Sequence, residues 1–177
     1  MVATMRSKVA AGAVVIALAV GVGSATIATT AHAGGAPATH LTFSSSLTSQ
    51  GKNLTTVGSR GQFVFGSNLL TGTTSVSGQA GTIQWVATVN YTDGNGPWTG
   101  LITVTTPTGT FGLDTRGQAS FVAATGTTTF KGTASVIGGT GAYVNMRGVG
   151  TETGVRTTAL GGAVDFTWHL TVVGAGA

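Results

Sequence analysis

Strict alternation of apolar and polar residues is the feature of this sequence that most constrains its fold. In residues 82–92 (TIQWVATVNYT) apolar side chains occupy every second position, and residues 162–173 (GAVDFTWHLTVV) repeat the pattern. A period of two places these side chains on one face of an extended strand, and β-branched and aromatic residues favour strands. Similar runs predict further strands over 40–48, 60–66, 69–77, 99–106, 116–123, 127–137 and 146–156.

Short stretches with turn chemistry separate these runs, namely SQGKN, DGNGP, TPTG, DTRGQ, GGTG and ALGG. About nine short strands without helical periodicity predict an all-β barrel or sandwich. The glycines favour the barrel. Gly148, Gly150 and Gly154 share one face of residues 145–154, and glycine on one face of a strand allows a narrow barrel to bend. We therefore predict a closed antiparallel β-barrel.

The first 33 residues have the pattern of a cleavable secretory signal peptide. Arg6 and Lys8 precede an apolar run over 9–23, and small residues end the segment at Ala33. The run is shorter than the roughly 20 residues that span a bilayer, so we expect cleavage, a secreted protein and no membrane anchor on the mature chain. The expected organisation is a signal peptide 1–33, a flexible leader 34–39 and one barrel domain 40–177.

Charged residues make up only 7% of the chain, and this low content argues against several function classes. The basic residues are scattered, so a nucleic-acid partner is not expected. The chain has no Cys, and only His40 and His169 follow the leader, so we expect no metal site. No serine stands in the context of a hydrolase nucleophile. We also expect no cofactor.

Residues 136–148 (VIGGTGAYVNMRG) contain the densest glycine cluster that invites a functional interpretation. A phosphate-binding loop would require a helix after the glycines, but another alternating run follows. We therefore predict a structural hairpin turn, because glycine adopts positive φ without strain. The predicted turn residues are Gly138, Gly139, Thr140 and Gly141.

The same segment resembles the G-G-T-G-x-F-x-x-A-R-G motif of dirigent proteins and of the allene oxide cyclase-like barrel superfamily. Tyr143 replaces the usual Phe and Met146 the usual Ala. The flanking FKGTASVI and GVGTETG are similar to the strands beside that motif. Outright matches are Gly138, Gly139, Thr140, Gly141, Arg147 and Gly148.

This resemblance implies an eight-stranded antiparallel barrel, often a homotrimer, with a largely apolar central cavity. It also implies cyclisation or coupling of a small molecule without a redox cofactor, and bacterial members of the superfamily include secreted proteins. We carry two hypotheses. In the first, the barrel binds a small apolar molecule and guides its cyclisation or coupling. In the second, it is a non-enzymatic extracellular structural or interaction protein that acts through the barrel exterior. Whether it is an enzyme stays open at this point.

Candidate site residues follow from the two clearest strands and the motif. For ligand binding they are Trp85, Tyr91 and Trp168, and for catalysis Asp165, His169 and Arg147. Asp165 and His169 share one face of the last strand with Cα atoms roughly 13 Å apart, so a molecule between them could contact both. The alternative is that this face is simply the solvated outside of the barrel.

Glu152 and Arg156 also share a face, in the predicted strand 146–156. A solvated or cross-strand pair is expected for these two residues.

Overall fold

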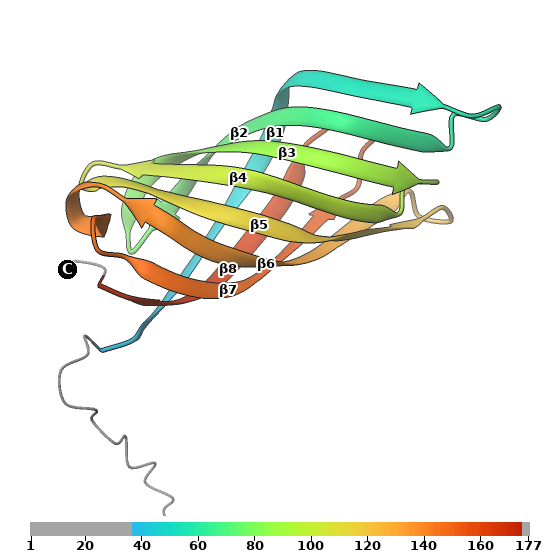
Figure 1. The fold of residues 1–177 in the computed structure, drawn as a ribbon. Coiled ribbons are helices and arrows are strands. Elements are labelled where there is room, and N and C mark those ends of the chain that lie inside the picture. The colour runs from blue at the N-terminus through green and yellow to red at the C-terminus, as the bar shows by residue number, and fades with distance from the viewer. Residues whose placement is uncertain (1–36, 175–177) are drawn as a thin grey trace, which may run out of the picture. The chain divides into compact units, whose positions relative to one another are not determined.

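The computed structural model describes residues 37–174, which form a closed barrel of antiparallel strands (Figure 1). Each strand pairs with its neighbours in the sequence, and β8 pairs back onto β1 to close the sheet. The predicted barrel is confirmed, whereas the expected signal peptide 1–33 lies outside the described residues. The strands are β1 (Thr39–Val57), β2 (Phe63–Val76), β3 (Gln79–Thr92), β4 (Gly96–Thr106), β5 (Gly109–Val122), β6 (Thr127–Gly139), β7 (Arg147–Arg156) and β8 (Val164–Val173).

The barrel has one strand fewer than the nine alternating runs of the sequence, because two of these runs form one strand, and the SQGKN and DTRGQ stretches lie within strands instead of between them. The SQGKN stretch lies inside β1, where a bulge between Ser49 and Gly51 absorbs the irregularity. Predicted strands 60–66 and 69–77 are one strand, β2, because Gly66 continues the extended chain with φ +133°. The DTRGQ stretch likewise lies within β5.

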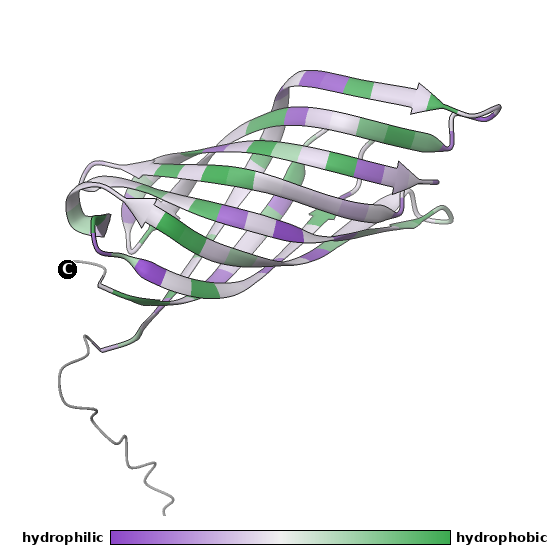
Figure 2. Ribbon diagram, in the orientation of Figure 1, coloured by the Kyte–Doolittle hydropathy of each residue, from purple (hydrophilic) through white to green (hydrophobic). Residues whose placement is uncertain are grey.

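A continuous column of aromatic rings fills the barrel interior. Hydropathy varies along the strands (Figure 2), and the alternating burial of their residues places these rings inside and polar residues outside. Trp168 stacks on Phe43 with ring centroids 5.0 Å apart, and Phe166 lies 5.6 Å from Trp168. Stacked and edge-to-face contacts between aromatic rings stabilise a protein beyond the area they bury. The column comprises Tyr143, Phe111, Phe43, Trp168, Phe166, Trp85, Trp98 and Phe130.

Inward-facing glycines provide the space in which the two tryptophans of β3 and β4 lie. A Cβ at Gly100 would lie 2.1 Å from Nε1 of Trp85, and one at Gly117 would lie 2.4 Å from the ring of Trp98. Real Cβ atoms do not approach other heavy atoms this closely. Glycine at these positions therefore lets each large ring pack against the neighbouring strand.

The two ends of the barrel differ. At the end where β6 leads into β7, a 3-10 helix, η1 (Gly141–Tyr143), covers the barrel, and Tyr143 and Met146 are buried. We call this the closed end. The predicted tight hairpin is therefore a longer connection that plugs the barrel, although Gly138 and Gly141 have the expected positive φ. No helix within residues 37–174 is long and apolar enough to cross a membrane.

At the opposite end, which we call the open end, β1 leaves β8. The two strands pair only from Thr39 to Leu47, while β1 continues to Val57 paired with β2 alone. The loop 157–163 follows β7 at this end, and its Leu160 packs together with Leu54 of β1 against the core. The connection that contains η1 thus covers the interior at the closed end, whereas a few side chains, including Leu54 and Leu160, cover it at the open end.

Substitution of Gly117 tests the packing of the tryptophans. Gly117→Ala is expected to lower the free energy of unfolding by about 1–3 kcal/mol, because the added methyl group displaces Trp98 or the β6 backbone. Gly51→Ala is the matched control, since nothing lies within 4 Å of a Cβ at this strand position. Chemical denaturation of both variants measures the difference, and equal stabilities would contradict the packing described here.

Candidate ligand-binding site

Two adjoining cavities lie at the open end of the barrel. The outer one, here the mouth cavity, has a volume of about 450 Å³ and is lined by apolar groups that include Val64, Phe121 and Leu160. The inner cavity has a volume of about 40 Å³ and lies among Asn68, Trp85, Trp98 and other core residues. Tyr91, Arg156 and Leu160 line both cavities and form the boundary between them.

Arg156, the last residue of β7, places a guanidinium group at this boundary. Only 9% of the residue is exposed. Its Nη2 donates a hydrogen bond of 3.0 Å to Oγ1 of Thr128, and its Cζ lies 5.5 Å from the ring centroid of Phe130. A cation over an aromatic face is attracted by the ring quadrupole. The guanidinium therefore caps the open end of the aromatic column.

The guanidinium of Arg156 has no carboxylate partner among the described residues. The chain has four acidic residues. Three of them, Asp93, Asp114 and Asp165, are exposed on turns or outward-facing positions, and the fourth, Glu152, binds another group. The Nε atom of Arg156 is buried without any hydrogen-bond partner. Burial lowers the pKa of Arg156, with the Tyr91 hydroxyl opposing this shift.

Glu152 precedes Arg156 by four residues on the inner face of β7 and lies deeper in the barrel. Its carboxyl group is buried. Oε2 accepts a hydrogen bond of 2.7 Å from Nε1 of Trp168, while Oε1 has no partner. Burial raises the pKa of Glu152 to about 8, and the Trp168 hydrogen bond opposes the shift. Glu152 is therefore protonated at neutral pH and does not neutralise Arg156, whose Cα is roughly 13 Å away along the strand.

Tyr91 faces Arg156 across the cavity boundary. Burial raises its pKa to about 12, and the nearby positive charge of Arg156 opposes this rise. The phenol consequently keeps its proton at neutral pH and remains a hydrogen-bond donor. Arg156 and Tyr91 together present donors, and no ionised acceptor, to the cavities.

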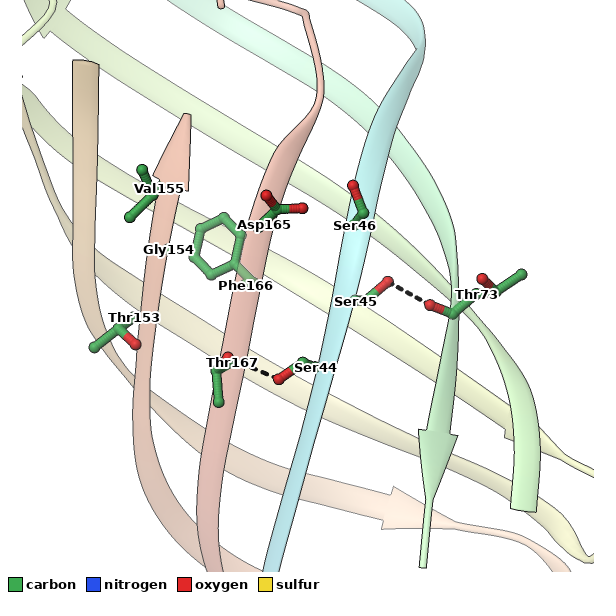
Figure 3. Close-up of a pocket in the computed structure, with 10 residues that line it drawn as sticks. All are labelled: Ser44, Ser45, Ser46, Thr73, Thr153, Gly154, Val155, Asp165, Phe166 and Thr167. Atoms are coloured by element: carbon green, nitrogen blue, oxygen red, sulfur yellow. Dashed lines mark hydrogen bonds between the residues drawn. The ribbon is translucent and has the colours of Figure 1, made fainter. Parts of the chain in front are cut away.

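The catalytic candidates from the sequence lie outside the barrel. Asp165, His169 and Arg147 are exposed, so the alternative of a solvated outer face is the one that the structure shows for the last strand. Asp165 lines a surface hollow with a volume of about 480 Å³. Figure 3 shows this carboxylate among the hydroxyl groups of the hollow. Two of these hydroxyl groups, on Ser44 and Thr167, are hydrogen bonded at 2.7 Å. These three residues do not reach the barrel interior because their neighbours in the sequence face inward.

The ligand-binding candidates lie inside. Trp85 and Tyr91 line the cavities, as a binding role requires. Trp168 is fully buried in the aromatic column and lines neither of the two cavities. In residues 37–174, no three His, Asp or Glu residues gather in a way that could hold a metal ion.

The expectation that Glu152 and Arg156 form a solvated pair was wrong, because both side chains are buried. These two are the site residues that the sequence did not reveal. Both side chains share strand parity with Gly148, Gly150 and Gly154, which the barrel requires on its inner face. Their even-numbered positions, shared with these glycines, were the signal in the sequence that could have predicted both side chains on the inner face of the barrel.

Comparison with known proteins adds a likeness of fold. No family model and no curated protein matches the sequence. The similar solved structures include two dirigent proteins. The pterocarpan synthase dirigent protein GePTS1 has 13% identity and a TM-score of 0.46 over 77% of this chain and 84% of its own. The pterocarpan synthase dirigent protein PsPTS1 has 14% identity and a TM-score of 0.48 over 78% and 96%.

Both similar structures are dirigent proteins, the group that the motif Gly138–Gly148 resembles. At these values the likeness concerns the fold and carries nothing about a ligand or a reaction in this chain. The closed barrel itself is established by the strand pairing described above.

Glu152 predicts a pH dependence of stability. Because its pKa is about 8 in the folded protein and near 4.5 when exposed, the folded state holds a proton that the unfolded state releases between these values. The free energy of unfolding should therefore be highest below pH 4.5 and fall by several kcal/mol towards pH 9, at about 1.4 kcal/mol per pKa unit.

Glu152→Gln should remove most of this fall, since the amide cannot ionise and can still accept the hydrogen bond from Trp168. Asp114→Asn, at an exposed outer position, is the control and should keep the fall. Urea denaturation at a series of pH values measures it, and an unchanged slope in Glu152→Gln would refute the assignment.

Proposed function

We propose that the protein binds one small, mainly apolar molecule through the mouth cavity of its barrel. The volume of about 450 Å³ lies within the range of small-molecule sites, roughly 300–1,000 Å³. Apolar walls with few polar groups are also usual for such sites. The observation that carries the proposal is the buried guanidinium of Arg156, which opens onto this cavity without an acidic partner.

The proposal includes a guiding role for the bound molecule. Walls that fix one conformer favour a cyclisation or coupling without a redox cofactor, which is the activity that the resemblance of Gly138–Gly148 implies. Tyr91 and Arg156 are among the polar residues that line the mouth cavity and can touch the molecule. We place this activity outside the cell, on the basis of the signal pattern in residues 1–33.

A variant that fills the cavity tests the binding role. Leu160→Trp should lower the affinity for N-phenyl-1-naphthylamine, an uncharged fluorescent probe, at least tenfold, because Leu160 lines both cavities. Val149→Trp, at a position 63% exposed, is the control and should bind as the unmodified protein does. Fluorescence titration measures the affinities. If the unmodified protein does not bind the probe, or if Leu160→Trp binds it equally well, the proposal fails.

A second candidate function is association through the barrel exterior. Leu69, Val86 and Leu101 oppose one another on neighbouring strands β2, β3 and β4, and Val86 and Leu101 are 51% and 57% exposed. A row of exposed aliphatic side chains is typical of an interaction surface. The partner proposed here is a second copy of the chain, in the homotrimer that the resemblance implies.

Sedimentation velocity tests this association. The purified protein should sediment as a trimer, and Leu101→Asp should shift it towards the monomer because a charge is placed in the aliphatic row. Thr103→Asp, an exposed change on the same strand face, is the control for added charge. A monomeric unmodified protein would exclude the trimer.

A further inference from the structure

We infer that the molecule bound in the mouth cavity carries one negatively charged carboxylate head group, which enters first and is held by Arg156. This inference rests on the proposed function and specifies the chemistry of its ligand. The ligand class is therefore a small amphiphile, with a carboxylate at one end and an apolar chain or ring at the other.

The donors of Arg156 suit a carboxylate. Nε has no partner, and Nη2 gives one hydrogen to Thr128 and retains a second. Nη1 and Nη2 together keep three hydrogens to which the structure gives no partner, and two N–H groups of the planar guanidinium match the two oxygens of a carboxylate in a bidentate pair. The side chain is nine-tenths buried, and its contacts with Thr128 and Phe130 hold the guanidinium in place.

The charge balance of the interior requires an anion from outside the chain. A buried cation without a partner is costly, and the pKa of Arg156 is lowered for that reason. Glu152 is hydrogen bonded to Trp168 and protonated at neutral pH, so it supplies no charge. The polar neighbours are Thr128 and Tyr91, both neutral. A carboxylate neutralises Arg156, whereas a dianionic phosphate would leave one charge unpaired in an apolar site.

The depth of the cavities sets the orientation of the ligand. Beyond Arg156 the inner cavity offers only about 40 Å³, which is room for one or two water molecules. The head group therefore stops at the boundary, where the phenol of Tyr91 is a further donor. The apolar part must extend outward between Val64, Phe121 and Leu160, the walls of the mouth cavity.

Displacement of the neutral probe by three ligands of equal chain length tests the inference. Decanoate should displace N-phenyl-1-naphthylamine at a concentration at least tenfold lower than decanol, and decyl phosphate should be weaker than decanoate. If the probe binds but decanoate and decanol displace it equally, the inference is overturned while the proposed binding function stands. If the probe does not bind at all, the proposed function itself fails.

Variants of the guanidinium assign the preference to one residue. Arg156→Met removes the charge but keeps an unbranched apolar stem, and it should abolish the preference for decanoate over decanol. Arg156→Lys keeps the positive charge but cannot form a bidentate pair, so it should retain part of the preference for decanoate. This variant also tests the inference if Arg156→Met does not fold. Arg116→Met, at an exposed position on β5, is the control and should behave as the unmodified protein. A preference that persists in both Arg156 variants at full strength would overturn the assignment.

Discussion

The aromatic column inside the barrel is the interaction on which the rest of the structure depends. It runs from Tyr143 at the plugged end to Phe130 at the open end through ring contacts of 4.8–5.9 Å. Because interiors are close packed, rings of this size leave space only where the column stops. Inward-facing glycines such as Gly100 and Gly117 are the counterpart of the rings, since any larger residue would collide with them. The column therefore decides which end of the barrel can receive a molecule.

Two ionisable side chains on β7 divide the interior into two environments. Glu152 lies among the rings, is held by Trp168 and keeps its proton, whereas Arg156 sits at the end of the column and keeps a charge that the chain does not balance. Four residues separate them on the same inner face, so alternation alone places both inside. The deeper group affects stability as the pH rises, and the outer group faces the mouth cavity. One strand, β7, therefore holds both the buried acid Glu152, which destabilises the fold at high pH, and Arg156, the polar group of the proposed site.

Sequence periodicity predicted the closed all-β sheet because alternation is a local property that the barrel preserves. It divided β2 into two runs, and it predicted a turn around Gly117, which instead lies within β5 because this glycine meets a tertiary demand that no local pattern reveals. Trp85 and Tyr91, the ligand-binding candidates on β3, are buried inside the barrel. Glu152 and Arg156 were placed outside because charged residues are usually solvated. In this narrow barrel, however, the alternation that puts the neighbouring glycines on the inner face puts these two charged side chains there too. The cavities themselves are formed by residues from several strands and from the loop 157–163, which only the three-dimensional structure brings together.

The most direct test is an anomalous diffraction map from crystals of the protein grown with 10-bromodecanoate. It locates the two ends of an amphiphile independently, the bromine by its anomalous signal and the carboxylate by its density. The interior described here predicts a carboxylate on the guanidinium of Arg156 and a bromine towards the mouth, between Val64 and Phe121. A bromine beside the aromatic column with the carboxylate in solvent, or a ligand bound only to the outer face, would contradict it.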